Sequence, residues 1–225
     1  TDERAVKVSQ DGKATAVAEG SASILAISSD GGFVGICRVT VTAKTEQAPG
    51  KVSSVKAGSE TTKSIKVTWN AAAGADSYKV HIYDYRTKKW TTAGTTASNS
   101  LIIQKLNSGT KYKVRVTAAN KVGEGTASQE VLTATKPNKT KITKIKKSNG
   151  KVKLTYKKAG DVGYQIYMKS GTGKFKKVAT TKKTSFTKRK LKKGRKYSFK
   201  IRAYVKNGSK VVYGSFSPVK SIRMK

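Results

Sequence analysis

Residues that could act as nucleophiles, general acids or metal ligands are few in this sequence. It holds one histidine, His81, and one cysteine, Cys37, too few for a zinc site built from nitrogen and sulfur ligands. A lone histidine also gives little support for a Ser-His-acid triad. The 12 acidic residues are dispersed and suggest no carboxylate pair of the glycosidase kind. We therefore expect no catalytic, cofactor-binding or metal site in this chain, and no enzyme activity of its own.

Three local features each have a structural interpretation. The alternation in Tyr78-Lys-Val-His-Ile82 places His81 on the outer, solvent-facing side of its strand. Cys37 falls on the inward face of a predicted strand over 34–41, so we expect a buried and inert thiol. Gly171-Thr-Gly-Lys174 is similar to part of a phosphate-binding loop, but it lacks the full spacing and the strand-to-helix context, so we expect a hairpin turn.

Net charge is the property that indicates a partner. The chain has 48 Lys and Arg against 12 Asp and Glu, which gives +36 and predicts attraction to polyanions. Anionic cell-wall polymers and acidic glycans rank well above nucleic acid among the candidates, and anionic lipid is a further one. The alternative is a solvated surface whose lysines serve solubility and protect strand edges.

Short alternating segments rich in Thr, Val and Tyr predict strands and turns rather than helices. Turns are marked by Asp11-Gly12, Glu19-Gly20 and Asp30-Gly31-Gly32 in the first 45 residues. Seven segments between residues 50 and 137 have the spacing of an Ig-like sandwich. The predicted strands are 5–8, 13–18, 21–28, 34–41, 52–57, 64–69, 77–84, 90–96, 101–106, 111–119 and 128–134.

Residues 138–225 repeat the pattern of the preceding segment. The aligned pairs are Trp69 with Tyr156, Tyr78 with Tyr164, Leu106 with Leu191 and Tyr112 with Tyr197. Both copies contain Leu-x-x-Gly-x-x-Tyr, which ends at Tyr112 in one and at Tyr197 in the other. We expect a tight turn at the glycine, followed by a tyrosine that packs inward and hydrogen-bonds that turn through its hydroxyl.

That motif, with the aromatic residues Trp69 and Tyr156, resembles the fibronectin type III family over residues 50–225. In the second copy Tyr156 replaces the usual tryptophan, and Lys188 stands where an inward apolar residue is common. The resemblance implies an all-β fold class of tandem Ig-like/fibronectin type III β-sandwiches. We call residues 48–137 the second module and residues 138–225 the third.

The first segment, residues 1–47, resembles the C-terminal half of a bacterial Ig-like domain of group 2. The matching residues are V-S-x-D-G-K-A-T-A-V-A-E-G-S-A-S-I over 8–24, then C-R-V-T-V over 37–41. The family's first strands are absent from this sequence. A half-sandwich would have an open edge and a half-covered core, so we expect either that this sequence was cut from a longer domain or that the missing strands come from another chain or segment.

The charge is concentrated at one end of the sequence. Residues 1–48 have a net charge of −1, residues 49–137 have +9, and residues 138–225, with 29 basic residues and 1 acidic residue, have +28. Strand parity predicts one outward face of the third module that carries Lys200 and Arg202 between Tyr167 and Tyr204. The preceding turn adds Lys190, Lys192, Lys193 and Arg195. Basic residues interleaved with aromatic rings are typical of polyanion or glycan binding.

These features predict a non-catalytic region of a bacterial secreted or cell-surface protein, acting as a spacer and as an adhesion or cell-wall-binding module. An alternative is a set of accessory modules of a larger extracellular carbohydrate-active enzyme whose catalytic domain lies outside this sequence. A third is recognition of a host surface protein through an edge strand or loop.

A single cysteine allows no internal disulfide, which suits exported proteins of Gram-positive bacteria. We therefore expect the cell wall, the cell surface or the medium of such an organism. No apolar run approaches the ~18 residues that a transmembrane segment needs. The chain opens on Thr1, and we interpret it as a fragment or processed product.

Overall fold

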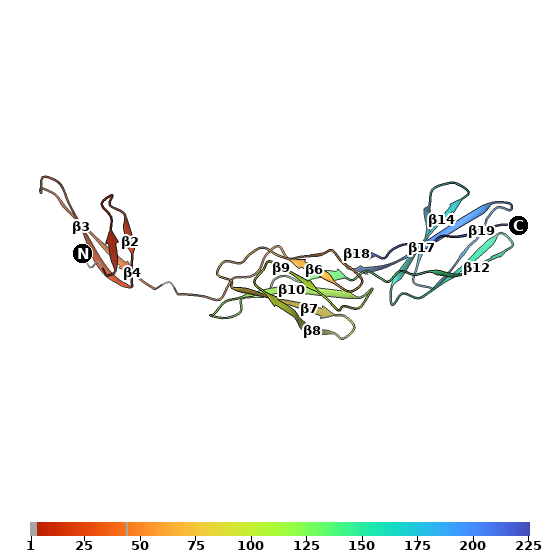
Figure 1. Cartoon of the computed structure of the whole chain (residues 1–225), viewed down its shortest axis with the longest axis horizontal. Helices are drawn as coiled ribbons and strands as arrows, with labels where there is room; N and C mark the ends of the chain where they lie inside the picture. Colours follow the sequence, from red (N-terminus) through yellow and green to blue (C-terminus); the bar gives the residue numbers. More distant parts are fainter. Residues whose placement is uncertain (1–3, 44) are drawn as a thin grey trace. The chain divides into compact units, whose positions relative to one another are not determined.

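The computed structural model describes residues 4–43 and 45–225, and these contain strands, turns and loops but no helix. The predicted all-β class is therefore confirmed. The chain divides into two compact units, residues 1–47 and residues 48–225 (Figure 1).

The first unit is made of two hairpins. Strand β1 (Val6–Val8) pairs antiparallel with β2 (Ala14–Ala16), and β3 (Gly20–Ile27) pairs antiparallel with β4 (Val34–Val41). The turns fall where the sequence predicts them, because Gly12 and Gly31 take the left-handed φ values of 82° and 72° that favour glycine.

The core of this unit is small. Its buried apolar residues are Ala5, Val6 and Ala22. The outer half of the β3–β4 hairpin is uncovered, and Phe33 and Ile36 are 79% and 67% exposed. The prediction of a buried Cys37 is therefore wrong: its thiol is exposed. Its strand position was correctly assigned, since Val39 and Val41 of the same face do pack on the core, but among residues 4–43 and 45–225 no second layer covers Cys37.

The second module is a sandwich of two antiparallel sheets. One has the order β5-β6-β9 and the other the order β11-β10-β7-β8. The strands are β5 (Lys56–Gly58), β6 (Ile65–Thr68), β7 (Ser77–Asp84), β8 (Lys89–Thr96), β9 (Ser100–Ile103), β10 (Lys111–Ala119) and β11 (Val131–Ala134). All seven overlap the strands predicted from the sequence.

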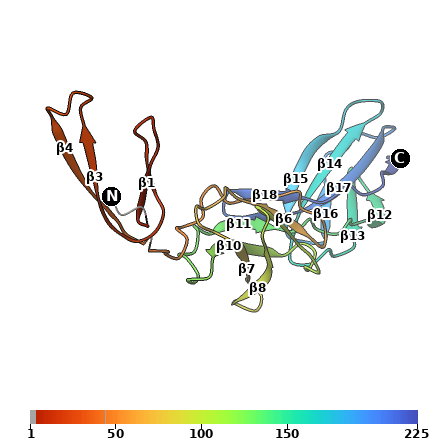
Figure 2. The same cartoon turned by 60° about the vertical axis from the view of Figure 1, so that its left-hand side comes forward.

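The third module repeats this arrangement. One sheet has the order β12-β13-β16; the other has the order β15-β14-β17-β18, with β19 also pairing with β17 (Figure 2). The strands are β12 (Ile142–Ser148), β13 (Lys151–Tyr156), β14 (Gly163–Ser170), β15 (Lys176–Thr181), β16 (Ser185–Lys188), β17 (Lys196–Asn207), β18 (Lys210–Tyr213) and β19 (Lys220–Arg223). Gly171 and Gly173 lie in the turn between β14 and β15, so the expected hairpin at 171–174 is confirmed.

Period-two alternation builds both cores, because one face of each strand is buried against the opposite sheet. The aligned aromatic residues occupy equivalent places: Trp69 packs on Tyr78 with ring centroids 5.4 Å apart, and Tyr156 packs on Tyr164 at 5.0 Å. Burial raises the pKa of Tyr156 to about 12, so its hydroxyl stays protonated and donates to the carbonyl of Lys183 at 2.9 Å.

The tyrosine of the repeated motif behaves as predicted in both modules. The hydroxyl of Tyr112 accepts the backbone N–H of Asn107 at 3.1 Å, and the hydroxyl of Tyr197 accepts that of Lys192 at 3.1 Å. Gly109 and Gly194 have positive φ values of 64° and 77° at the turns. Each tyrosine therefore fastens the loop that precedes its own strand.

The two modules of the second unit meet through the hairpin of β17 and β18. At its tip Asn207, only 4% exposed, donates from Nδ2 to the carbonyls of Tyr112 and Thr133, both at 2.9 Å. Lys210 forms an ion pair of 2.8 Å with Glu60 of the second module. These contacts join residues that are 74 to 150 positions apart in the sequence.

Candidate polyanion-binding surface

Strand β17 carries the central row of the candidate surface. Its inward residues are Tyr197, Phe199, Ile201, Ala203 and Val205, all buried. Alternation then turns Lys200, Arg202, Tyr204 and Lys206 outward onto one face of the sheet. The predicted parity of this strand is confirmed, and the row continues one position beyond the predicted residues, to Lys206.

Arg202 is the most constrained member of the row. Its guanidinium lies 3.8 Å from the ring centroid of Tyr213 and 5.0 Å from that of Phe216. Its Nε donates to Oε1 of Gln165 at 2.9 Å, and a terminal nitrogen donates to the hydroxyl of Tyr167 at 3.1 Å. A planar guanidinium can stack and hydrogen-bond at once, so this charge is held in one orientation.

Lys200 occupies the next place along the same face. Its ammonium lies 4.1 Å from the ring centroid of Phe216 and 4.6 Å from that of Phe175. Phe216 is therefore shared between Lys200 and Arg202, and rings and cations alternate across the sheet. We call Phe175, Lys200, Phe216, Arg202 and Tyr213 the cation–ring ladder.

The two tyrosines predicted beside these cations have supporting roles. Tyr167 lies opposite Lys200 in register, and its hydroxyl accepts a hydrogen bond from Arg202 and donates one to Oε1 of Gln165. The ring of Tyr204 covers Gly163 of β14 so closely that a Cβ there would lie 2.4 Å from the ring. Tyr167 also contacts the ring of Phe216 edge-on, at 5.0 Å between centroids, so both tyrosines pack against other residues of the module.

The structure separates the eight predicted residues into two groups. Lys190, Lys192, Lys193 and Arg195 are exposed in the turn before β17, at the end of the sandwich. Lys190 has a φ of 58°, as does its counterpart Lys105 with 57°. Arg195 and Arg202 are seven strand residues apart, or about 23 Å. An extended ligand could contact both groups, whereas a small one could not.

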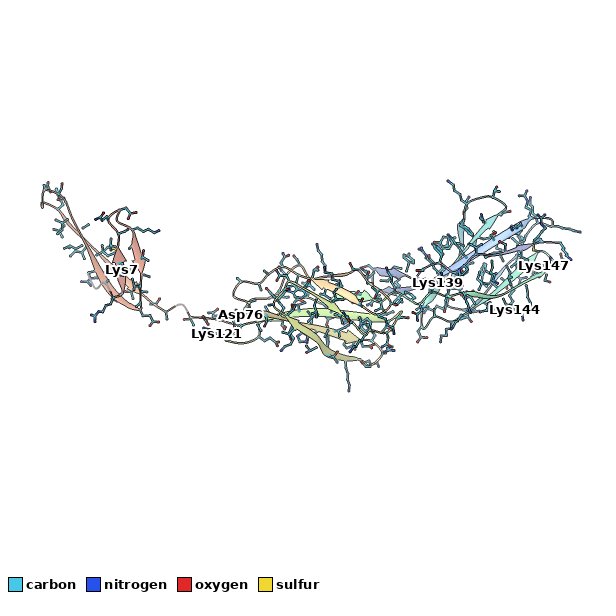
Figure 3. The ribbon with its side chains drawn as sticks, viewed as in Figure 1. Lys7, Asp76, Lys121, Lys139, Lys144 and Lys147 are labelled. Atoms are coloured by element: carbon cyan, nitrogen blue, oxygen red, sulfur yellow. The ribbon has the colours of Figure 1, made fainter. Side chains whose placement is uncertain are left out.

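Acidic side chains neutralise little of the positive charge of the third module. The one acidic residue of the third module, Asp161, forms an exposed ion pair with Lys158 at 3.4 Å. Lys210 finds its carboxylate, Glu60, on the second module. Most of the 29 basic residues in 138–225 therefore have no acidic residue to pair with, and side chains such as Lys144 and Lys147 project from the surface (Figure 3).

Several members of the surface lie outside the predicted set. Phe175 precedes β15, and Tyr213 and Phe216 lie at and beyond the end of β18. Strand parity could have found Lys206, which is in register with the predicted row. It could not find Phe175 or Phe216, because they lie in irregular segments.

The second module has a smaller counterpart of the ladder. The guanidinium of Arg115 lies 4.4 Å from the ring centroid of Trp90, and the ammonium of Lys113 lies 5.5 Å from that of Tyr83. His81 is on the outer face as predicted, but it is half-buried: its Nε2 lies 3.2 Å from Oγ1 of Thr117. Burial first, and Arg115 second, lower the pKa of His81 below its ordinary value of 6.5.

Two kinds of feature are absent from the part of the chain that the structure describes. Residues 4–43 and 45–225 contain no group of three or more His, Cys, Asp and Glu side chains able to hold a metal ion. None of their elements is a helix long and apolar enough to cross a membrane.

Two stretches of the chain match models of known domain families. Residues 47–134 match the model of the fibronectin type III domain, and residues 143–211 match that of the PBP1-like, fibronectin3-like domain. The chain thus contains fibronectin type III domains in tandem, as the repeat predicted. Nothing in these matches tests the likeness of residues 1–47 to a bacterial Ig-like domain, which stays a prediction.

The fold is also that of a solved structure, the first of the two matches that follow. A two-fibronectin-type-III-domain segment of chicken tenascin matches with a TM-score of 0.52 and 17% identity, over 79% of this chain and 100% of that one. The FN1–FN3 domains of chicken CNTN1 match with a TM-score of 0.37 and 18% identity, over 78% of this chain and 67% of that one. No curated protein matches the chain.

Proposed function

We propose that this tandem of fibronectin type III domains is a non-catalytic spacer region of a bacterial secreted or cell-surface protein, and that its third module attaches to anionic wall polymers or acidic glycans. The supporting observation is the surface of β17. It orders Lys200 and Arg202 among aromatic rings in a module with 29 basic residues and 1 acidic residue.

A cation that is already ordered loses little conformational entropy when a ligand binds it. Arg202 is already held by Gln165, Tyr167 and Tyr213, so a ligand does not have to restrict its side chain. The flexible lysines around it raise the local concentration of any polyanion, and this attraction weakens with salt. The binding is therefore electrostatic, tolerant of sequence or linkage, and reversible.

The test measures binding of the full chain to isolated Gram-positive wall material at increasing NaCl concentrations. We expect strong binding at low salt and a steep loss on going to 0.5 M. A variant with Lys190, Lys192 and Lys193 changed to Gln should bind more weakly than a matched variant with Lys51, Lys56 and Lys66 of the second module changed to Gln. All six lysines are exposed, and each variant loses three charges. Absence of binding at low salt, or binding insensitive to salt, would refute the proposal.

A further inference from the structure

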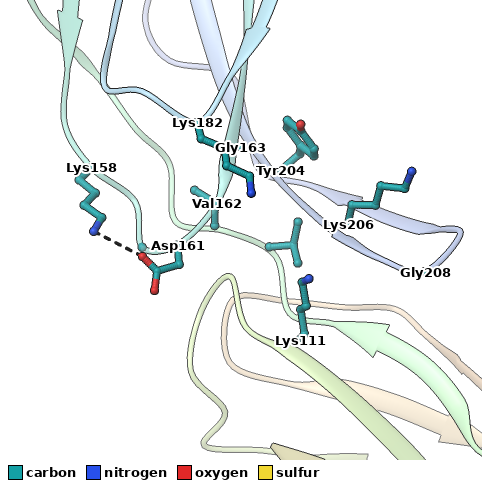
Figure 4. A pocket seen from close by; sticks show the side chains of 11 residues that line it. Lys111, Lys158, Asp161, Val162, Gly163, Lys182, Tyr204, Lys206 and Gly208 are labelled. Carbon is teal, nitrogen blue, oxygen red and sulfur yellow. Dashed lines mark ion pairs between the residues drawn. The ribbon is translucent and has the colours of Figure 1, made fainter. Parts of the chain in front are cut away.

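A hollow of about 690 Å³ lies beside Tyr204, where the two modules of residues 48–225 meet (Figure 4). Its lining includes four lysines, which are Lys111, Lys158, Lys182 and Lys206. One carboxylate, that of Asp161, also lines it and pairs with Lys158. We call this feature the junction groove.

The four lysines come from separate parts of the sequence. Lys111 begins β10 of the second module, and Lys206 is next to the last residue of β17. Lys158 and Lys182 follow β13 and β15. All four are exposed, and the ammonium groups of Lys111 and Lys182 point toward each other across the groove (Figure 4). The fold therefore brings together four cations that the sequence keeps as many as 95 residues apart.

An adjoining hollow of about 720 Å³ extends the same positive region. It shares Lys111, Lys158 and Asp161 with the junction groove and adds Lys63 and Arg86 of the second module. Across both hollows the charged lining is six cations and one carboxylate. A lining of one sign in a concave surface concentrates the electrostatic potential and attracts an anion of matching size.

Packing fixes the walls of the junction groove. Val162 is 6% exposed, and it lies so close to Gly109 that a Cβ on that glycine would meet its Cγ1 at 3.0 Å. Asn207, between the lining residues Lys206 and Gly208, is held by two hydrogen bonds of 2.9 Å to the second module. Tyr204 is held over Gly163. The groove therefore has a preformed shape.

We propose that the junction groove binds a short stretch of an anionic sugar or polyol chain bearing phosphate, sulfate or carboxylate groups. The inference rests on the proposed function and names a specific site for it. The outward row of β17 leads from Lys200 and Arg202 through Tyr204 to Lys206, so a chain bound on the ladder can continue into the groove. Ligand sites are about 300–1,000 Å³, which is room for a few units of such a chain.

The lining favours this ligand over a nucleic acid. Single-stranded nucleic acids are held by aromatic rings on which bases stack. Tyr204 is the one aromatic residue of the groove, and its ring lies on Gly163. Lysine ammonium groups act as point charges and accept phosphate, sulfate or carboxylate alike. The class of ligand is therefore set by the anionic groups that it carries rather than by bases.

The experiment compares two charge-matched variants of the full chain. The groove variant changes Lys111, Lys158, Lys182 and Lys206 to Gln. The control variant changes Lys66, Lys144, Lys146 and Lys153, also one lysine of the second module and three of the third, and all exposed. The probe is a sulfated tetrasaccharide, with tripolyphosphate and a six-residue oligothymidylate as further arms, and calorimetry at 50 mM NaCl gives the affinity.

We expect at least a tenfold loss of tetrasaccharide affinity in the groove variant and less than a threefold loss in the control, with both variants folded by circular dichroism. Equal losses in the two variants, or no binding by the unaltered chain, would overturn the site. Tighter binding of oligothymidylate at the groove would overturn the ligand class. If the chain binds none of the three probes at the groove but still binds wall material in a salt-dependent way, the groove is refuted as a site and the proposed function still holds. Failure of wall binding alone removes the proposed function.

Discussion

Replacing Asn207 with alanine tests the junction without changing any charge. Asn207 belongs to the third module, yet its amide donates to the carbonyls of Tyr112 and Thr133 in the second, and it is 4% exposed. Each hydrogen bond contributes about 1 kcal/mol net, and a buried carbonyl left without a donor costs about 1–3 kcal/mol. We expect Asn207→Ala to lower the free energy of unfolding of the second module by about 2 kcal/mol, since water reaching the opened junction offsets part of the loss.

The two tryptophans make this measurement specific. Trp69 and Trp90 both lie in the second module, so urea unfolding followed by tryptophan fluorescence reports that module alone. The control is Ser209→Ala in the same hairpin, an exposed position for which we expect less than 0.5 kcal/mol. A loss below 0.5 kcal/mol for Asn207→Ala would refute the reasoning, because it would mean that the hairpin does not stabilise the neighbouring module.

The same substitution has a consequence for binding. Asn207 lies between Lys206 and Gly208 of the junction groove. Its amide donates to the carbonyl of Tyr112, the residue that follows Lys111. Loosening this link should separate Lys111 from the lysines of the third module. We therefore expect a threefold to tenfold loss of tetrasaccharide affinity in Asn207→Ala, with the net charge unchanged. An unchanged affinity would show that the lysines act independently of their fixed spacing.

Four further substitutions test other parts of the structure. Arg202→Lys keeps the charge but loses the hydrogen bonds to Gln165 and Tyr167, so we expect the free energy of unfolding to fall by about 1–2 kcal/mol in thermal unfolding. An unchanged melting temperature would show that these contacts of Arg202 do not stabilise the module. Tyr112→Phe and Tyr197→Phe each remove one acceptor of a loop N–H, so both should cost about 1 kcal/mol in urea unfolding, and a large inequality would argue against equivalent corners. Burial and Arg115 lower the pKa of His81 in the folded chain, so the unfolded chain takes up this proton first as the pH falls. The stability that neutral His81 contributes is therefore full above about pH 6.5 and is lost as the pH falls through the lower pKa of the folded state. The unaltered chain should therefore lose stability between pH 7 and pH 5 more than His81→Gln does, and parallel profiles would contradict this assignment.

Local patterns made much of the fold predictable from the sequence. The motif ending at Tyr112 and Tyr197 specifies a turn, an inward ring and a hydrogen bond within six residues, so its geometry follows without knowledge of the rest of the chain. Alternation in β17 likewise assigned Lys200, Arg202 and Tyr204 to one face. Both depend on a period of two, which the sequence displays directly.

Burial was harder to predict than parity. Cys37 is on the predicted face of β4, but its exposure depends on whether another layer covers that face, and none does among the described residues. His81 is on the outer face, yet Oγ1 of Thr117 on the neighbouring strand lies 3.2 Å from its Nε2, and Arg115 pairs with it in register. Burial depends in both cases on whether residues distant in the sequence cover the side chain, and periodicity carries no information about those residues.

The junction groove shows the same limit for function. Its lysines belong to two modules, and they converge because the hairpin of β17 and β18 contacts the end of β10 and β11. A sequence rich in lysine predicts a basic surface, but it does not say which lysines meet in a concave site. Phe175 and Phe216, which hold Lys200, were missed for a related reason, since irregular segments have no parity to follow.

The charge of the third module leads to a final prediction about stability. A net charge of +28 on 88 residues opposes the compact state through self-repulsion, and the one carboxylate of that module relieves little of it. Any polyanion that binds the folded module should therefore raise its melting temperature, by mass action and by neutralising the repulsion. Salt screens the same repulsion but also weakens binding. In a thermal scan we expect the sulfated tetrasaccharide to stabilise the chain at 50 mM NaCl and to lose its effect by 0.5 M, while the chain without ligand becomes more stable as salt increases. A melting temperature that falls with the tetrasaccharide at low salt would show that the polyanion prefers the unfolded chain, and the ordered cations of β17 and the junction groove would then have no role in binding.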